Sequence, residues 1–425
     1  MITTLLITVF VLGYIAIAFE HPLKLNKAAS ALITGVICWT IYILQSQSAD
    51  TVTEELLHHL GEIASILFFL LGAMTIVELI DTHDGFDIIT QKIKTTSKSK
   101  LLVIITVLTF FLSALLDNLT TAIVMSSLCA KLLVDKEHKL WFCGMIIIAA
   151  NAGGAWSPLG DVTTTMLWIG GQITALNIMK QLILPSIAVC LFPAIIVAYR
   201  FRGMKFNPIP ESTATVKEKT DSRIILFAGI GFLVFVPIFK TLTHLPPFMG
   251  MMLALGLMWV LTTIIHKNKE PEIVEKLTVA KALQKVDTPS ILFFLGILLA
   301  VSALQSFGLL KEMALFLSST FKNDYLIGIT LGLLSAIVDN VPLVAASQGM
   351  YDLTTYPTDH PFWEFLALTT GTGGSAIIIG SAAGVAVMGI EHIDFIWYLK
   401  KISWLALIGF AAGVLVFMLQ IWSGG

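Results

Sequence analysis

Residues 113–118 read SALLDN and residues 335–340 read SAIVDN, two copies of one pattern that begin 222 residues apart. Each copy ends in an Asp-Asn pair in the middle of a long apolar segment. A charge in an apolar segment is costly and usually serves a function. The repeated pair therefore predicts a duplicated fold with a functional carboxylate in each half.

Flanking matches occur in the same order in both halves. Residues 151–154 read NAGG and residues 371–374 read GTGG, and Gly160 corresponds to Gly380. Matches in one order at nearly one spacing indicate an internal repeat. The predicted first repeat, linker and second repeat are residues 1–200, 201–222 and 223–425.

The composition places both repeats in a membrane. Of 425 residues, 56% are apolar and 13% are charged, whereas soluble domains are about 25% charged. Many apolar stretches reach the roughly 20 residues that cross a bilayer. The net charge of −2 gives no reason to expect nucleic-acid binding. The apolar segments lie near residues 2–19, 28–44, 63–80, 101–133, 141–169, 178–200, 223–240, 247–265, 290–307, 325–350, 362–389 and 400–422.

The distribution of Lys and Arg predicts the topology, because loops rich in these residues stay on the cytoplasmic side. Basic loops flank segment 101–133 at both ends, whereas the loops that flank segment 325–350 carry few basic residues. Both Asp-Asn segments are therefore predicted to be re-entrant hairpins that enter from opposite sides. The count then gives ten spans, two hairpins and both termini on the periplasmic side.

The predicted fold is an all-α membrane protein of two inverted repeats, each with five spans and one re-entrant hairpin. Inverted repeats with broken helices are typical of secondary transporters, whose site lies at the repeat interface. Broken helices must face protein or a water-filled cavity. Backbone carbonyls, amides and hydroxyls beside a carboxylate make a site of hard oxygen ligands, which suits sodium.

A buried carboxylate also suggests a mechanism. Burial raises the pKa of a carboxylic acid, and a nearby cation lowers it. A carboxylate that holds either a proton or sodium couples the two by competition, which predicts antiport. We expect sodium at Asp117, Asn118 and Asp161; because Asp161 corresponds to Ser381, the first repeat carries more of the charge. The predicted cation and proton site comprises Ser113, Asp117, Asn118, Thr120, Asn151, Ser157, Asp161, Asp339, Asn340, Thr372 and Ser375.

A second polar cluster follows the third span. Glu78, Asp81 and His83 are predicted to lie at its cytoplasmic end, where His83 titrates near neutrality. The cluster is either a solvated helix end or a patch that senses pH or passes protons to the site. No resident cofactor is expected.

Structural alternatives stay open for these motifs. Each Asp-Asn pair is also a good helix N-cap, and the Gly-rich runs are also sites where helices pack closely. The run Thr163 to Thr165 is predicted to bond back within its own helix. His58 and His59 are predicted to lie on a solvated outer loop.

Three stretches resemble NhaD-type sodium/proton antiporters: residues 78–86, 113–122 and 151–161. This group belongs to a larger ion transporter superfamily that includes arsenite permeases and dicarboxylate transporters. The dicarboxylate branch carries Ser-Asn-Thr at its hairpin tips, where this chain has Asp-Asn. The resemblance implies a homodimer that moves by an elevator mechanism. Its scaffold would be near residues 1–44, 178–265 and 400–422, and its transport elements near 63–169 and 290–390.

The resemblance and the residues together predict a transporter, not an enzyme. The expected activity is exchange of sodium, and of lithium, for protons across a prokaryotic inner membrane. An arsenite or other anion permease of the same superfamily is the alternative. A remote alternative is an intramembrane aspartyl protease with Asp117 and Asp339 as its dyad, although the Gly-Xaa-Gly-Asp signature is absent.

Overall fold

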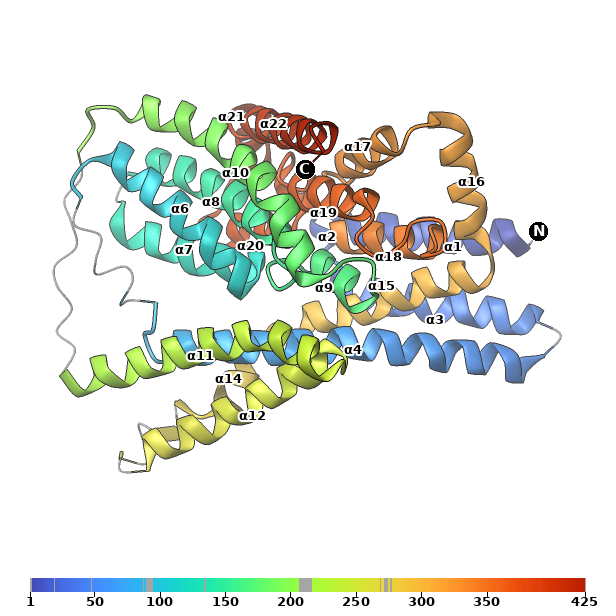
Figure 1. Cartoon of the computed structure of the whole chain (residues 1–425), viewed down its shortest axis with the longest axis horizontal. Coiled ribbons are helices and arrows are strands. Elements are labelled where there is room, and N and C mark those ends of the chain that lie inside the picture. Colours follow the sequence, from blue (N-terminus) through green and yellow to red (C-terminus); the bar gives the residue numbers. More distant parts are fainter. Residues whose placement is uncertain are drawn as a thin grey trace.

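The chain is described here by a computed structural model. The structure describes residues 2–18, 20–46, 48–86, 88, 95–133, 135–205, 216–267, 269–270, 274–275 and 277–424. Helices make up this described part almost entirely (Figure 1), and its only extended pairing is an isolated bridge between Ser97 and Lys205. The all-α prediction is confirmed.

The helices of the first half are α1 (Ile2–Ala18), α2 (Glu20–Leu23), α3 (Lys27–Gln45), α4 (Ala49–Thr82), α6 (Lys98–Leu116), α7 (Asn118–Leu132), α8 (Lys136–Ala155), α9 (Val162–Ile169) and α10 (Ala175–Arg200). Those of the second half are α11 (Val216–Thr243), α12 (Pro247–His266), α14 (Val279–Lys285), α15 (Thr288–Ser306), α16 (Leu309–Phe321), α17 (Asp324–Leu334), α18 (Asn340–Met350), α19 (Pro361–Gly373), the 3-10 turn η1 (Ile378–Gly380), α20 (Ala382–Glu391), α21 (Phe395–Lys401) and α22 (Ser403–Trp422).

Eight of the described helices are long and apolar enough to cross a membrane, or nine if the bent pair of α20 and α21 counts as one span. The eight are α3, α4, α6, α10, α11, α12, α15 and α22. The multi-pass prediction is therefore confirmed, but α6, expected as one arm of a hairpin, is itself 19 residues long. The predicted spans 141–169 and 362–389 are both broken: α8 ends at Ala155, just after Gly153 and Gly154, and α9 begins at Val162, while α19 ends at Gly373 and α20 begins at Ala382 after the turn η1.

The first Asp-Asn segment forms a helical hairpin. α6 ends at Leu116, α7 begins at Asn118, and the two helices pack against each other. Asp117 joins them with φ of 77° and ψ of 158°, a backbone region that residues other than glycine adopt only where the surrounding structure holds them there. The chain therefore reverses within one residue, as the interrupted apolar pattern predicts.

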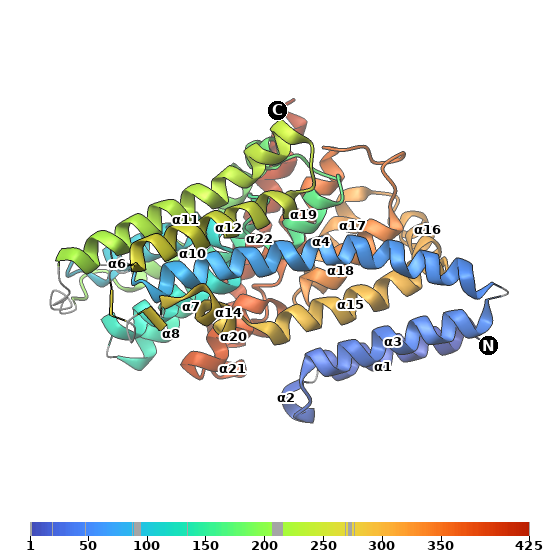
Figure 2. The same cartoon turned by 90° about the horizontal axis from the view of Figure 1, so that it is seen from below.

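The second Asp-Asn segment is broken in the same place but packs differently. α17 ends at Leu334 and α18 begins at Asn340, while α16 packs against both helices. Figure 1 places α6 and α7 toward one end of the long axis and α17 and α18 toward the opposite end. In Figure 2, α4 runs along the molecule beside α15, which packs in turn against α3.

The Gly-rich breaks are held by close backbone contacts that recur in both halves. A Cβ at Gly160 would lie 2.7 Å from the Ser113 carbonyl oxygen, and a Cβ at Gly380 would lie 2.5 Å from the Ala336 carbonyl oxygen. Such distances leave no room for a side chain. The close-packing alternative for these glycines is therefore confirmed, and the same contacts hold each break against its hairpin.

The outer loop predicted at residues 45–62 is wrong. Ser48 caps α4 by accepting a hydrogen bond from the Thr51 amide, and the helix runs from Ala49 through both histidines. His58 is exposed on this helix, while His59 packs inward with its Nε2 3.2 Å from Ser306 Oγ. A strong cap allows polar residues to continue a helix beyond its apolar part. The loop predicted at 308–324 is likewise largely helical, as α16.

Gly160→Ala tests the packing of the break. The added methyl must displace backbone atoms of α6 and α8, so we expect the free energy of unfolding to fall by about 1–3 kcal/mol. Gly61→Ala is the matched control, because nothing lies within 4 Å of a Cβ there. The measurement is thermal unfolding in detergent, and equal midpoints for both variants would contradict the packing account.

Candidate functional site

Asp161 is the centre of a buried polar network. It precedes α9 as its N-cap, and its Oδ1 accepts hydrogen bonds from the amide and the hydroxyl of Thr163, both at 2.8 Å. Only 1% of the residue is exposed. The Gly-rich break thus ends in a carboxylate that is fixed by the first turn of the following helix.

Both Asp-Asn segments reach this carboxylate through the Asn of their pair. Asn118 Nδ2 donates to Asp161 Oδ2 at 2.6 Å. Asn340 Nδ2 lies 3.3 Å and 3.4 Å from the two carboxylate oxygens of the same residue. Both amides are buried. Two segments more than 200 residues apart therefore meet at one anionic side chain.

Asn151 links this centre to the break in the second half. Its Oδ1 accepts from Asn118 Nδ2 at 3.1 Å, and its Nδ2 donates to Ser375 Oγ at 2.8 Å and to Ser381 Oγ at 2.9 Å. Ser381 is itself the N-cap of α20. The network therefore joins the first helices after both Gly-rich breaks, with the carboxylate on one side and a hydroxyl on the other.

The two carboxylates of the Asp-Asn pairs have different partners. Asp117 accepts from the amide and the hydroxyl of Thr120 at 2.8 Å, and Asp339 accepts from the Val341 amide at 3.2 Å. Each is the N-cap of the helix that follows, so the capping alternative holds for both pairs. Each nevertheless directly precedes the buried Asn, Asn118 or Asn340, that reaches Asp161. Capping and a role in ion binding are therefore compatible.

The remaining predicted ligands bond to the backbone. Ser113 Oγ donates to the Ala150 carbonyl at 2.5 Å, and Thr372 Oγ1 donates to the Leu368 carbonyl at 2.6 Å. Ser157 Oγ accepts from the Leu159 amide at 3.2 Å. The network thus brings together Asn118, Asn151, Asp161, Asn340 and Ser375 from the predicted set. The other six residues of the set bond elsewhere: Ser113, Asp117, Thr120, Ser157, Asp339 and Thr372.

The threonines after Asp161 bear out a prediction in part. Thr164 Oγ1 donates to the carbonyls of Ser157 and Asp161, and Thr165 Oγ1 donates to the Pro158 carbonyl at 2.8 Å. The bond from Thr164 to Asp161 is the predicted back-bond, whereas the bonds to Ser157 and Pro158 satisfy carbonyls of the break. A break leaves carbonyls without helical partners, and nearby hydroxyls can replace those partners.

Glu364 is a buried carboxyl group that the sequence prediction missed. It lies on α19 with 1% exposure, and its Oε1 accepts from Asn177 Nδ2 at 2.7 Å. Its Oε2 has no hydrogen-bond partner within the described part of the chain. The sequence could have indicated this buried carboxyl group, because Glu364 is the only acidic residue in the apolar segment 362–389.

The predicted cluster after the third span is not simply a solvated helix end. His83 is buried, its Nδ1 donates to the Leu79 carbonyl at 2.7 Å, and its Nε2 lies 3.0 Å from His266 Nε2. Burial lowers the pKa of His83. Glu78 pairs with Lys285 at 3.0 Å. Asp81 is exposed in the last turn of α4, as expected for a residue at a solvated helix end.

The sequence matches a known family of membrane transporters over most of its length. The family described as citrate transporter, CitMHS, matches residues 14–371. The chain belongs to this family. Because this family and the named relatives below are transporters, the protease alternative is set aside and the prediction that the chain is not an enzyme is confirmed.

Three relatives are similar over nearly the whole chain. Sodium/proton antiporter 1 of Arabidopsis thaliana is 46% identical over 411 residues, which cover 96% of this chain and 71% of that protein. Sodium/proton antiporter 2 of the same plant is 44% identical over 412 residues, 96% and 97% of the two chains. The Na(+)/H(+) antiporter NhaD of Vibrio cholerae is 30% identical over 447 residues, 97% and 90% of the two chains. The predicted resemblance to NhaD-type transporters is confirmed.

The buried histidine predicts a pH dependence of stability. Since the pKa of His83 is lowered in the folded protein, the unfolded chain binds that proton more tightly. The contribution of neutral His83 is therefore complete above about pH 6.5 and is lost as the pH falls below it, by at most about 1.4 kcal/mol per pH unit. His83→Asn should flatten this loss in thermal unfolding between pH 7.5 and 5. His58→Asn, at an exposed site on α4, should leave the slope unchanged; a wild-type slope in both variants would contradict the assignment.

Proposed function

We propose that the chain exchanges sodium for protons across a membrane, with the two ions competing for the carboxylate of Asp161. The single observation that carries the proposal is that this carboxylate is buried and receives amide N–H groups from both hairpin tips. In the described part of the chain, no Lys or Arg forms an ion pair with it. A buried carboxylate without a fixed cation favours a bound proton or a bound metal cation.

The side chains around Asp161 are suited to sodium. An amide that donates N–H to a carboxylate presents its oxygen instead when it turns over, so Asn118 and Asn340 can face either the anion or a cation. Asn151, Ser375 and Ser381 add further oxygens on the same network. An all-oxygen set with one carboxylate suits a small hard cation, sodium or lithium.

Asp117 and Asp339 would supply a second layer of negative charge. We place sodium between Asp117, Asn118 and Asp161, as the sequence predicts, and assign Asp339 a weaker role because its half has Ser381 in place of a central carboxylate. Using Ser113, Thr120, Ser157 or Thr372 as ligands would require each to leave its present partner. Four helices end and four begin around the network, which directs both carbonyls and amides toward it.

The same architecture supports two inverted repeats, residues 1–200 and 223–425, joined by a linker. The two Asp-Asn segments lie in opposite halves of the molecule along its long axis (Figure 1). Ser113 bonds to the Ala150 carbonyl as Ser335 bonds to the Thr370 carbonyl, so corresponding residues make corresponding contacts. On the resemblance to NhaD-type proteins we further propose a homodimer in an inner membrane, with re-entrant hairpins, periplasmic termini and transport elements 63–169 and 290–390 that move against the scaffold.

Glu78, Asp81 and His83 are proposed to adjust transport to pH from the linker end of the molecule. His83 contacts His266, and the ion pair between Asp221 and Lys269, at 2.8 Å, lies close enough to affect both rings electrostatically. A protonated His83 cannot accept the hydrogen bond from His266. Protonation makes Nε2 of His83 a donor, so it reverses or breaks the contact with His266 and places a new charge between α4 and α12, which is the proposed link between pH and transport.

An anion permease is the second candidate, since the family description names citrate. An anion site needs basic side chains or unopposed donors, whereas this network has a carboxylate at its centre. The two candidates differ in their response to sodium. We expect proton flux in proteoliposomes to depend on sodium or lithium, and transport that is indifferent to both would favour the anion permease.

Asp161→Asn is the direct test of the central carboxylate. Without an ionisable group the site cannot alternate between proton and cation, so we expect sodium-dependent proton flux to fall at least 100-fold, in line with removing an essential acid-base group. The measurement is dequenching of a pH dye in proteoliposomes after sodium addition. Glu54→Gln, an exposed acid on α4, is the control. Full flux in Asp161→Asn would contradict the proposal.

The inequality of the repeats gives another test. Asp117→Asn and Asp339→Asn remove matched capping carboxylates from the two hairpins while an amide can still cap each helix. We expect the first substitution to raise the sodium concentration for half-maximal flux much more than the second, because only the first lies beside both Asn118 and the predicted sodium. Equal effects would mean that the two halves share the cation charge.

A further inference from the structure

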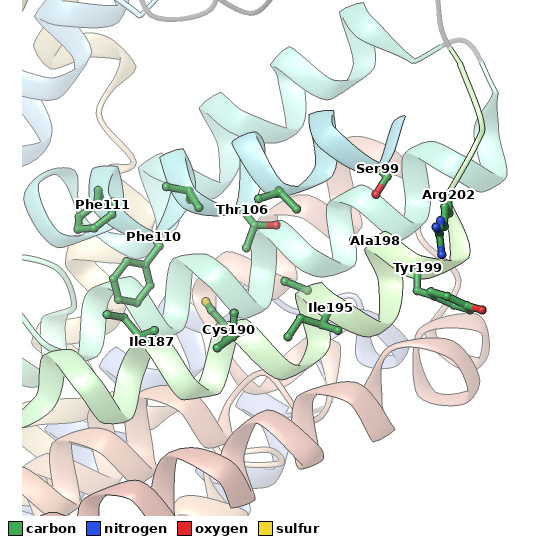
Figure 3. A pocket seen from close by; sticks show the side chains of 14 residues that line it. Ser99, Thr106, Phe110, Phe111, Ile187, Cys190, Ile195, Ala198, Tyr199 and Arg202 are labelled. Carbon is green, nitrogen blue, oxygen red and sulfur yellow. The ribbon is translucent and has the colours of Figure 1, made fainter. Parts of the chain in front are cut away.

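An apolar groove of about 590 Å³ runs along the outside of the molecule between α6 and α10 (Figure 3). Val103, Val107 and Phe111 line it from α6, and Ile187, Leu191 and Ile195 line it from α10. These six side chains are between 37% and 57% exposed. An exposed apolar hollow between two helices that are long and apolar enough to span a membrane marks a surface that binds lipid or another protein.

One end of the groove is polar and positively charged. Ser99, Tyr199 and Arg202 line this end, and no acidic residue lines any part of the groove. Arg202 is exposed and forms no ion pair within the described residues. Figure 3 places Ser99, Tyr199 and Arg202 together at the end opposite Phe110 and Phe111.

The backbone fixes Arg202 close to the beginning of α6. The Lys98 amide donates to the Met204 carbonyl at 2.9 Å, and Ser97 forms a β-bridge with Lys205. The segment after α10 is thereby tied to the first turn of α6. The N-terminus of a helix attracts anions, so a helix terminus and a guanidinium face the same end of the groove.

The length of the groove matches one lipid tail. From Ser99 to Phe111 the helix rises by about 18 Å. This length is slightly more than half of the ~30 Å hydrocarbon thickness of a bilayer, which is the depth that the chains of one leaflet occupy. The polar end then lies at the level of the head groups and the apolar part at the level of the tails.

We propose that this groove binds an anionic phospholipid, with an acyl chain between α6 and α10 and its phosphate on Arg202 and the first turn of α6. Basic pockets between membrane helices commonly recognise acidic head groups. The far end of the tail contacts Phe110 and Phe111, whose rings lie 5.9 Å and 6.3 Å from that of Trp156 in the break after α8. The lipid therefore lies against the hairpin arm that leads to Asp117, and the proposal does not depend on the identity of the transported ion.

Native mass spectrometry of the full-length protein in detergent tests the site. Phosphatidylglycerol and phosphatidylcholine with the same acyl chains are added in equal amounts, and we expect preferential retention of phosphatidylglycerol. Arg202→Gln should weaken its binding about 10-fold, the contribution of a charged hydrogen bond. Lys180→Gln removes an exposed positive charge from the opposite end of α10 and should have no effect. Ala198→Phe, which narrows the groove, should reduce retention of both lipids.

Several results would overturn the proposal. Equal retention of the two lipids, or retention that Arg202→Gln leaves unchanged, would remove the role of the charged end. Displacement of the lipid by millimolar inorganic phosphate would show that the tail is not held in the groove. A dimer that Ala198→Phe dissociates, without bound lipid in the wild type, would instead assign the groove to a second copy of the chain.

Discussion

The carboxylate of Asp161 and the two amides that reach it are the interaction on which the rest of the structure depends. A buried carboxylate must be compensated by hydrogen bonds or a counter-charge. Here the donors come from the breaks of both Asp-Asn segments and from the helix that Asp161 itself begins. If either Asp-Asn segment moved away, the carboxylate would lose a donor. The two halves of the chain are therefore held in register by a group that also has a reason to bind a cation.

Side chains beside the broken helices stabilise the buried polar network in an apolar interior. Each break leaves backbone groups unpaired, and nearby side chains satisfy them: Thr164 and Thr165 serve the carbonyls of the first break, and Asp161 serves the amides of α9. Glycines then let the broken segments approach the hairpins without side chains between them. Because the unpaired backbone groups at the helix breaks need polar partners, polar side chains cluster there, and the proposed cation site lies within this cluster.

Much of this could be predicted from the sequence, because the decisive signals are local. The Asp-Asn pairs, the Gly-rich runs and their spacing gave the all-α fold, the breaks and most of the network. What could not be predicted depends on contacts between distant segments. His83 meets His266 across 183 positions, and Glu364 meets Asn177 across 187. The continuation of α4 through His58 was missed because its polar residues resemble a loop until the Ser48 cap is considered.

The central claim is that a proton and sodium exclude each other at Asp161, and calorimetry tests it most directly. Sodium is titrated into the purified protein at several pH values, in buffers of different ionisation enthalpy, and the number of protons released is obtained from the heats. We expect sodium binding to weaken as the pH falls and to release protons, and both effects to disappear in Asp161→Asn. Sodium binding that releases no protons, or that is unchanged in the variant, would contradict the account.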